Sequence, residues 1–185
     1  KTFKSVKNKT ITDKTLKKYI DYLLDAFLVS KACRYDIKGK KYIGSLAKYY
    51  FEDIGLRNAR LNFRQIEENH LMENIIYNEL RIRGFQVDVG MVEKYEKNKE
   101  DKTLRKNLEV DFVAAKGSEK YYIQSAFSMP TPEKQAQEER PLNAIGDSFK
   151  KIIVVRDNIR VRRNETGIII VGIRNFLLDE TILNP

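Results

Sequence analysis

The sequence predicts an α/β domain in which helices flank a mixed β-sheet. Segments with helical periodicity alternate with apolar strand patterns, and this alternation is typical of α/β folds. Two short apolar runs near the C-terminal end, at 152–155 and 167–172, are typical of buried strands. The 185 residues suffice for one such domain, or for one domain with a small appendage.

The composition favours a folded protein of a reducing compartment. Hydrophobic residues make up 42% of the chain and charged residues 33%, with only four prolines and nine glycines. Cys33 and His70 are the only residues of their types, so the chain has neither an intrachain disulfide nor a Cys/His set for structural zinc. We therefore expect a cytoplasmic setting. No apolar run approaches the ~20 residues that span a bilayer, so we expect no membrane partner. The chain opens at Lys1, which we interpret as a cut end of a longer protein.

The charge indicates a polyanionic partner. A net charge of +9 and a pI near 9.5 are typical of proteins that contact phosphates, so DNA is the expected partner. The alternative is that these basic residues only solvate the surface. The candidate phosphate contacts form two groups, Lys17, Lys18, Lys38, Lys40 and Lys41 in the first and Arg160, Arg162 and Arg163 in the second.

Residues 1–45 predict a helix followed by a basic hairpin. The helix begins after Thr12 or Asp13, and its apolar side consists of Leu16, Tyr19, Ile20, Leu23, Leu24 and Phe27. A strand at 27–29, a basic turn at 36–41 and a return strand at 42–43 follow. This order is typical of the last helix and wing of a winged helix-turn-helix, here truncated. An equally supported alternative is that the helix and hairpin pack on the main domain, which we place at 46–185.

The rest of the chain predicts further helices and strands of the main domain. A short helix is expected at 49–56, and a longer one from about Ile66 to Arg83, with Gly84 directly after its end. A polar helix at 131–150, interrupted at Pro141, comes later. The expected strands lie at 85–92, 108–114, 121–127, 152–155 and 167–172, with a solvated charged loop at 93–106 and a short helix or tail at 176–178.

Two neighbouring strands carry the residues that indicate chemistry. Asp111 lies inside one apolar strand pattern, and Gln124 lies 124 − 111 = 13 residues later in the next. A helix that leads into a three-strand meander, followed by helix, strand and strand, resembles the core of restriction-endonuclease-like, or PD-(D/E)XK, domains. In such nucleases acidic groups on adjacent strands hold Mg²⁺, which activates water, and a lysine stabilises the transition state.

This resemblance implies a degenerate site of Glu73, Asp111 and Gln124. Asp111 takes the place of the metal-binding aspartate, and Gln124 that of the second acid. Ala126 stands where the family has its lysine. Glu73, 84 − 73 = 11 residues before Gly84, resembles the helical glutamate of Holliday-junction resolvases. The same three residues are the candidate Mg²⁺ ligands, and the lost lysine leaves open whether the site is active, because one such group contributes on the order of 10²–10³ in rate.

Other interpretations of these residues remain open at the level of sequence. Asp111 could face water on an edge strand, and Gln124 could satisfy backbone groups of the sheet. Glu79 falls on the apolar side of its helix and is the alternative helical acid. Lys116 and Lys120 are the nearest lysines, but neither has the spacing to replace the missing one.

Five segments together resemble a known family. They are "KKYIDYLLDAFLV", "GSLAKYYFEDIGLRNA", "LMENIIYNELRIRGFQVDVG", "EVDFVA" and "YYIQSAFSM". They are similar to a C-terminal domain of unknown function in bacterial and archaeal AAA-type ATPases, in which glutamine followed by a non-lysine is the usual state of the second strand. This resemblance implies an upstream ATPase module as partner. The chain itself has no Gly-x-x-x-x-Gly-Lys-Ser/Thr loop, so we expect no ATP binding of that kind.

The sequence thus supports one main function and two rivals. The main expectation is a nuclease-like, DNA-contacting module of an AAA-type ATPase. The first rival is an active Mg²⁺-dependent DNA nuclease with a displaced lysine. The second is a protein-interaction or regulatory domain without catalysis.

Overall fold

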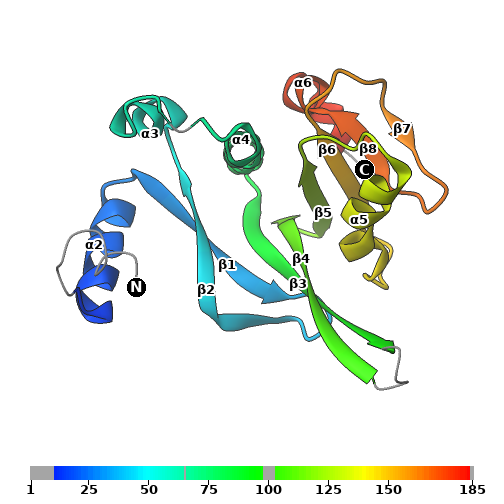
Figure 1. Ribbon diagram of the computed structural model, residues 1–185, viewed down its shortest axis with the longest axis horizontal. Helices are drawn as coiled ribbons and strands as arrows, with labels where there is room; N and C mark the ends of the chain where they lie inside the picture. The colour runs from blue at the N-terminus through cyan, green and yellow to red at the C-terminus, as the bar shows by residue number, and fades with distance from the viewer. Residues whose placement is uncertain (1–10, 65, 98–102, 184–185) are drawn as a thin grey trace.

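A computed structural model describes residues 11–64, 66–97 and 103–183 of the chain (Figure 1). One mixed sheet has the strand order β2-β1-β3-β4-β5-β6-β8-β7 in these residues, and helices cover it, so the predicted α/β class is confirmed. The strands are β1 Val29–Asp36, β2 Lys41–Phe51, β3 Gln86–Lys97, β4 Thr103–Lys116, β5 Glu119–Ala126, β6 Lys150–Val155, β7 Arg162–Arg163 and β8 Ile169–Gly172. The α-helices are α2 Asp13–Asp25, α3 Ile54–Arg60, α4 Glu68–Ile82, α5 Pro132–Asn143 and α6 Ile173–Leu178.

The sheet combines an antiparallel meander with parallel pairs at both ends. β3, β4 and β5 form the meander that the sequence predicted. β6 and β8 extend it in parallel on one side, and β1 pairs in parallel with β3 on the other. A short 3₁₀ helix, Glu180–Leu183, ends the described chain.

Hydrophobic cores lie on both faces of the sheet. The first core contains Met72 and Ile76 of α4 together with Phe176 of α6. The second contains Leu142 of α5 and Ile145. Because strand side chains alternate between faces, each strand residue can be assigned to the α4 face or the α5 face by the core that it joins.

Helix α4 is tied to the end of β2 by a buried amide. Asn74 is buried, accepts the backbone N–H of Phe51 at 2.9 Å and donates to the Phe51 carbonyl at 2.8 Å. The helix lies within the predicted span, and Gly84 follows its end with φ +83, the left-handed conformation in which glycine carries no Cβ penalty. This contact fixes β2 relative to α4.

Several expected boundaries are wrong. Residues 49–51 belong to β2 rather than to a helix, and α3 begins only at Ile54. The helix expected to reach 150 ends at Asn143, and Lys150 is the first residue of β6. The charged segment expected to be a loop continues β3 and β4 on either side of 98–102. In each case tertiary pairing overrides the local pattern.

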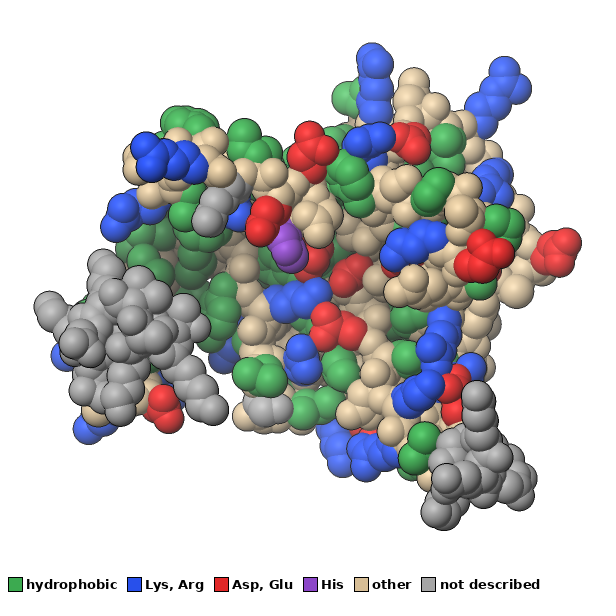
Figure 2. Space-filling model, viewed as in Figure 1, with side chains coloured by type: hydrophobic (Ala, Val, Ile, Leu, Met, Phe, Trp, Pro, Cys, Tyr) green, Lys and Arg blue, Asp and Glu red, His purple; other side chains and the backbone are tan. Residues whose placement is uncertain are grey.

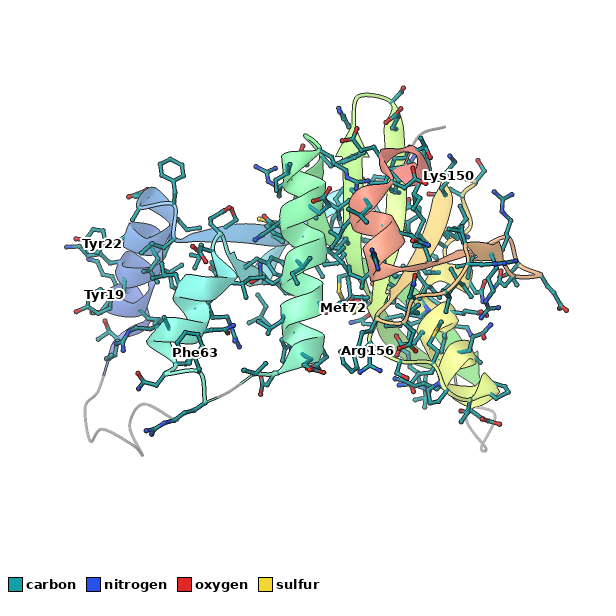
Figure 3. All side chains as sticks on the ribbon, turned by 90° about the horizontal axis from the view of Figure 1, so that it is seen from above. Tyr19, Tyr22, Phe63, Met72, Lys150 and Arg156 are labelled. Atoms are coloured by element: carbon teal, nitrogen blue, oxygen red, sulfur yellow. The ribbon has the colours of Figure 1, made fainter. Side chains whose placement is uncertain are left out.

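The first hairpin continues the main sheet. The predicted boundary at residue 45 falls inside β2, and β1 pairs with β3 from Arg34 to Asp36. Helix α2 has Thr12 as its N-cap and no buried residue, and Figure 3 shows Tyr19 and Tyr22 on its outer side. Residues 1–10, including the expected cut end at Lys1, lie outside the described residues.

We predict that Gly90→Ala destabilises the fold by about 1–3 kcal/mol, because overpacking forces neighbours to shift. A Cβ at this point of β3 would come within 2.9 Å of Ile37 and Val113 and within 3.0 Å of Val110. Gly146→Ala is the matched control, since an added Cβ there meets nothing within 4 Å. Urea unfolding of both variants checks this, and equal midpoints would contradict it.

Candidate functional site

The candidate site is a lysine surrounded by three carboxylates. The ammonium nitrogen Nζ of Lys48 lies 2.9 Å from Glu73 Oε1, 2.9 Å from Glu109 Oε1 and 3.2 Å from Asp111 Oδ1. We call these four residues the Lys48 cluster. Asp111 is buried, and the side chains of Glu73 and Lys48 are only 18% and 25% exposed. The cluster is therefore recessed below the surface.

A β-bulge in β4 directs Asp111 into the cluster. Asp88 pairs with Val113 and Gly90 with Val110, so 113 − 110 = 3 steps on β4 oppose 90 − 88 = 2 steps on β3. The extra residue lets Asp111 and Phe112 share the α4 face instead of alternating. Phe112 accordingly packs in the core beneath α4.

A larger bulge in β2 directs Lys48 to the same face. Ala32 pairs with Lys48 and Arg34 with Ile43, so 48 − 43 = 5 steps on β2 oppose 34 − 32 = 2 steps on β1. Three extra residues invert the alternation of the strand. Lys48 and Tyr50 thereby point toward α4, where Glu73 is located.

The carboxylates also have partners besides Lys48. The hydroxyl of Tyr50 donates to Glu73 at 2.7 Å, and the guanidinium of Arg34 donates to Glu109 at 2.8 Å. The backbone N–H of Ser125 donates to Asp111 Oδ2 at 2.9 Å. With Arg34 counted beside Lys48, three acids and two bases leave a formal charge of −3 + 2 = −1 when all are ionised.

Burial governs the protonation of the cluster. It raises the pKa of the Asp111 carboxyl from 3.8 to about 6, and the charge of Glu73 adds to this while Lys48 opposes it. Burial alone would lower the pKa of Lys48, but Asp111 and Glu73 outweigh it and raise this pKa. Burial and Glu73 also raise the pKa of Tyr50, which therefore stays a hydrogen-bond donor.

The structure brings together two of the three predicted site residues. Glu73 and Asp111 meet through Lys48, whereas Glu79 pairs with Arg83 at 2.7 Å. Gln124 does not reach the carboxylates, because its pairing partner Ile153 belongs to the core on the α5 face. Its side chain instead accepts the backbone N–H of Asp111 at 3.4 Å.

Neither Lys116 nor Lys120 replaces the motif lysine that Ala126 lacks, because both lie away from the Lys48 cluster. Ala126 is buried in the core on the α5 face. Lys116 donates to the Arg83 carbonyl at 2.9 Å, and Lys120 lies 5.0 Å from the centroid of the Phe149 ring. Neither takes part in the Lys48 cluster.

Sequence reasoning missed Lys48, Glu109 and Tyr50. Glu109 lies two residues before Asp111, a spacing that places both on one face of a regular strand. That spacing was an available signal. Lys48 and Tyr50 gave no such signal, because the sequence pattern of their segment predicts a domain boundary followed by a helix.

The cluster as it stands fits an ammonium group rather than a divalent metal ion. Carboxylate oxygens are the ligands that Mg²⁺ prefers. The Lys48 ammonium nevertheless takes the position between them, and no three His, Cys, Asp or Glu side chains in the described parts of the chain are arranged to hold a metal ion.

Two cavities adjoin the cluster on either side of the first turns of α4. The first, of about 380 Å³, is lined on the side of β2 and α3 by residues that include Lys48, Arg57, His70, Glu73 and Asn74. The second, of about 630 Å³, is lined on the side of β5 and α5 by residues that include Asn69, Ser125, Phe127, Ser128 and Lys134. Figure 2 shows acidic and basic side chains intermixed around the purple histidine near the centre of this face.

The predicted phosphate contacts are exposed but do not form one patch. The first group lies on α2, in the turn between β1 and β2 and at the start of β2, and Lys38 of the turn donates to the Glu93 carbonyl at 2.9 Å. The second group lies on and beside β7. β2 and β7 are opposite edges of the sheet (Figure 1).

We predict that Lys48→Met destabilises the protein by about 3 kcal/mol, because three carboxylates then lose their central counter-charge. Asp111→Asn in the same chain should restore part of this loss, since it removes one of the charges. The exposed Lys31 of β1 gives the matched control Lys31→Met, expected within about 0.5 kcal/mol of the original. Equal losses in the two methionine variants, measured by chemical denaturation, would refute a central role for Lys48.

We also predict that Asp111 makes the stability fall as pH rises from about 4 to about 6. The folded protein holds this proton up to about pH 6, whereas the unfolded chain releases it near pH 3.8. A rise of that size corresponds to about 3 kcal/mol. Denaturation at both pH values should show this loss in the original chain but not in Asp111→Asn, and parallel pH profiles would contradict it.

Comparisons with known proteins give relatives without an assigned activity. Residues 2–67 match a family described as a domain of unknown function (DUF8612). An uncharacterized protein of Haemophilus influenzae is 37% identical over 140 residues, which cover 76% of this chain and 31% of that protein. The uncharacterized protein MJ1544 of Methanocaldococcus jannaschii is 28% identical over 154 residues, which cover 83% and 31%. The chain therefore spans about a third of the length of these relatives.

A solved structure shares a distant likeness. The crystal structure of protein VC1899 from Vibrio cholerae matches 91% of this chain and 43% of that chain, at 13% identity and a TM-score of 0.38. This degree of similarity supports no argument about the site. Among the described residues, no helix has both the length and the apolar character needed to cross a membrane.

Proposed function

We propose that this chain is the nuclease-like, DNA-contacting module of an AAA-type ATPase, in which a lysine ammonium takes the place of the metal. The observation that carries the proposal is the position of Lys48 Nζ, within 3.2 Å of Glu73, Glu109 and Asp111. The module belongs to the restriction-endonuclease-like type on this proposal, and ATP binding belongs to the ATPase module.

The topology supports this assignment. A helix, α4, precedes the antiparallel meander β3-β4-β5, and the parallel strands β6 and β8 follow α5. The helical acid Glu73 and the strand acid Asp111 approach the same ammonium group. A restriction-endonuclease-like core brings its helical and strand acids together in this manner.

The contacts of the cluster favour DNA holding over cleavage. Each carboxylate has a second partner besides Lys48, so the cluster is already satisfied without a metal ion. A lysine that neutralises the acids cannot at the same time stabilise charge on a phosphate. The chemistry of the nuclease would then be lost while its fold is kept.

The basic surface supports contact with DNA. The net charge of +9 favours a polyanion, and the predicted contacts on α2, in the β1–β2 turn and near β7 are exposed. Contacts of this kind hold phosphates without reading the base sequence. Because the two groups lie at opposite edges of the sheet, they would engage an extended ligand or two separate segments.

A second candidate function is supported by the same lysine. Lys48 contacts both acids that an Mg²⁺-dependent DNA nuclease would use, and it could serve as the displaced lysine of that motif. The candidates differ in one respect. Cleavage requires Lys48 to leave the carboxylates so that they become free for a metal ion, whereas holding requires no such movement.

We predict salt-sensitive binding of DNA without cleavage. Labelled single-stranded, duplex and branched DNA are incubated with the chain in Mg²⁺ or Mn²⁺, and binding is recorded in the same samples by fluorescence anisotropy. The affinity should fall at least about tenfold between roughly 50 and 200 mM salt, because bound phosphates release counterions.

Asp111→Asn and Lys48→Met serve as the matched variants. Metal-dependent cleavage that disappears in both variants would establish the second candidate. Absence of binding to every DNA form would overturn the proposed function and favour a protein-interaction domain.

A further inference from the structure

The Lys48 cluster is recessed in a way that a DNA duplex does not match. Asp111 is only 8% exposed, and the side chains of Glu73 and Lys48 are mostly covered. The phosphates of a duplex lie on the outside of a rigid rod, whose grooves alone are roughly 6–12 Å wide. Enzymes that hold a base in a recessed pocket bind single strands or nucleotides that have left the stack.

The cavity on the side of β2 and α3 has basic and planar groups at its wall. Arg57 of α3 and His70 of α4 line it together with Lys48, and the side chain of His70 is 61% exposed. A cavity of about 380 Å³ is large enough for a small planar ligand such as one base but far too small for a duplex.

The cavity on the side of β5 and α5 has an aromatic wall with a guanidinium over it. Phe127 lines this cavity beside Ser128, with Glu68 also at the wall and Lys134 paired with Glu138 at 2.6 Å. The guanidinium carbon of Arg156 lies 4.6 Å from the centroid of the Phe127 ring. Arg156 is exposed, so the outer face of its planar group remains accessible (labelled in Figure 3). Bases of unpaired strands stack on aromatic rings and on arginine planes.

The two cavities flank the same helical turns. Asn69 of α4 lines one cavity, and its neighbour His70 lines the other. The cluster lies between them, because Glu73 borders the first cavity and Ser125, which binds Asp111, borders the second. An unpaired strand laid across the start of α4 would place a base in each cavity and keep its phosphates toward solvent, away from the net negative charge of the cluster.

We propose that this module binds DNA as an unpaired single strand across the start of α4, with bases held at His70 on one side and at Arg156 and Phe127 on the other. This inference rests on the proposed function and adds the substrate class to it. The exposed lysines of α2 then supply general attraction to phosphates, whereas the two cavities discriminate single strand from duplex.

The test compares a labelled single-stranded oligonucleotide with a duplex of the same length by fluorescence anisotropy. The single strand should bind more tightly. Arg156→Ala and His70→Ala should each weaken single-strand binding about tenfold, the size expected for one stacked base, and affect duplex binding much less. His70→Phe should retain most of the affinity because it keeps a planar ring.

Two matched variants separate stacking from charge. Arg156→Lys keeps the charge but lacks the planar group, so it should bind single strands as weakly as Arg156→Ala. The double variant Lys17→Ala, Lys18→Ala lies away from both cavities and should weaken single strand and duplex alike. Thermal unfolding of every variant verifies that the fold is retained.

The outcomes distinguish the single-strand inference from the proposed function on which it rests. Equal affinity for both DNA forms, or single-strand binding unchanged in Arg156→Ala and His70→Ala, would overturn the inference and leave the proposed function standing. Absence of salt-sensitive binding to either form would overturn the proposed function, and the inference with it.

Discussion

The structure around the candidate site depends on one charge constraint. Three carboxylates from α4 and β4 lie too close together to be buried without a cation, and Lys48 supplies it from β2. The interaction joins segments 73 − 48 = 25 and 111 − 48 = 63 residues apart. It therefore fixes the first hairpin, the long helix and the centre of the sheet relative to one another.

Backbone irregularities make this constraint attainable. The bulges in β2 and β4 each add an odd number of residues, so they change which face of the sheet the following side chain occupies. Asn74 then holds the end of β2 against α4. Without the two bulges the side chains of Lys48 and Asp111 would not both face α4, and the Lys48 cluster could not form.

The same arrangement separates two kinds of surface. The recessed cluster carries a small net negative charge, whereas the predicted phosphate contacts lie on α2, around the β1–β2 turn and near β7, toward the two edges of the sheet. On the proposed function, attraction to DNA phosphates and discrimination of single strand from duplex at α4 would therefore belong to different residues. This division explains why net charge alone is a poor guide to where a ligand would lie.

The sequence by itself determined the α/β class, the meander, helix α4 and its terminal glycine, because periodicity and turn residues encode these locally. It also predicted Glu73 and Asp111 as acids of one site, and in the structure both contact Lys48. It also predicted Gln124 as a member of that site, but the bulge in β4 turns Asp111 to the α4 face while Gln124 stays on the α5 face. The apolar pattern of the sequence does not reveal such a bulge. Only the tertiary structure placed Lys48 among the acids, since that contact depends on long-range pairing of β1, β2 and β3, which no local pattern records.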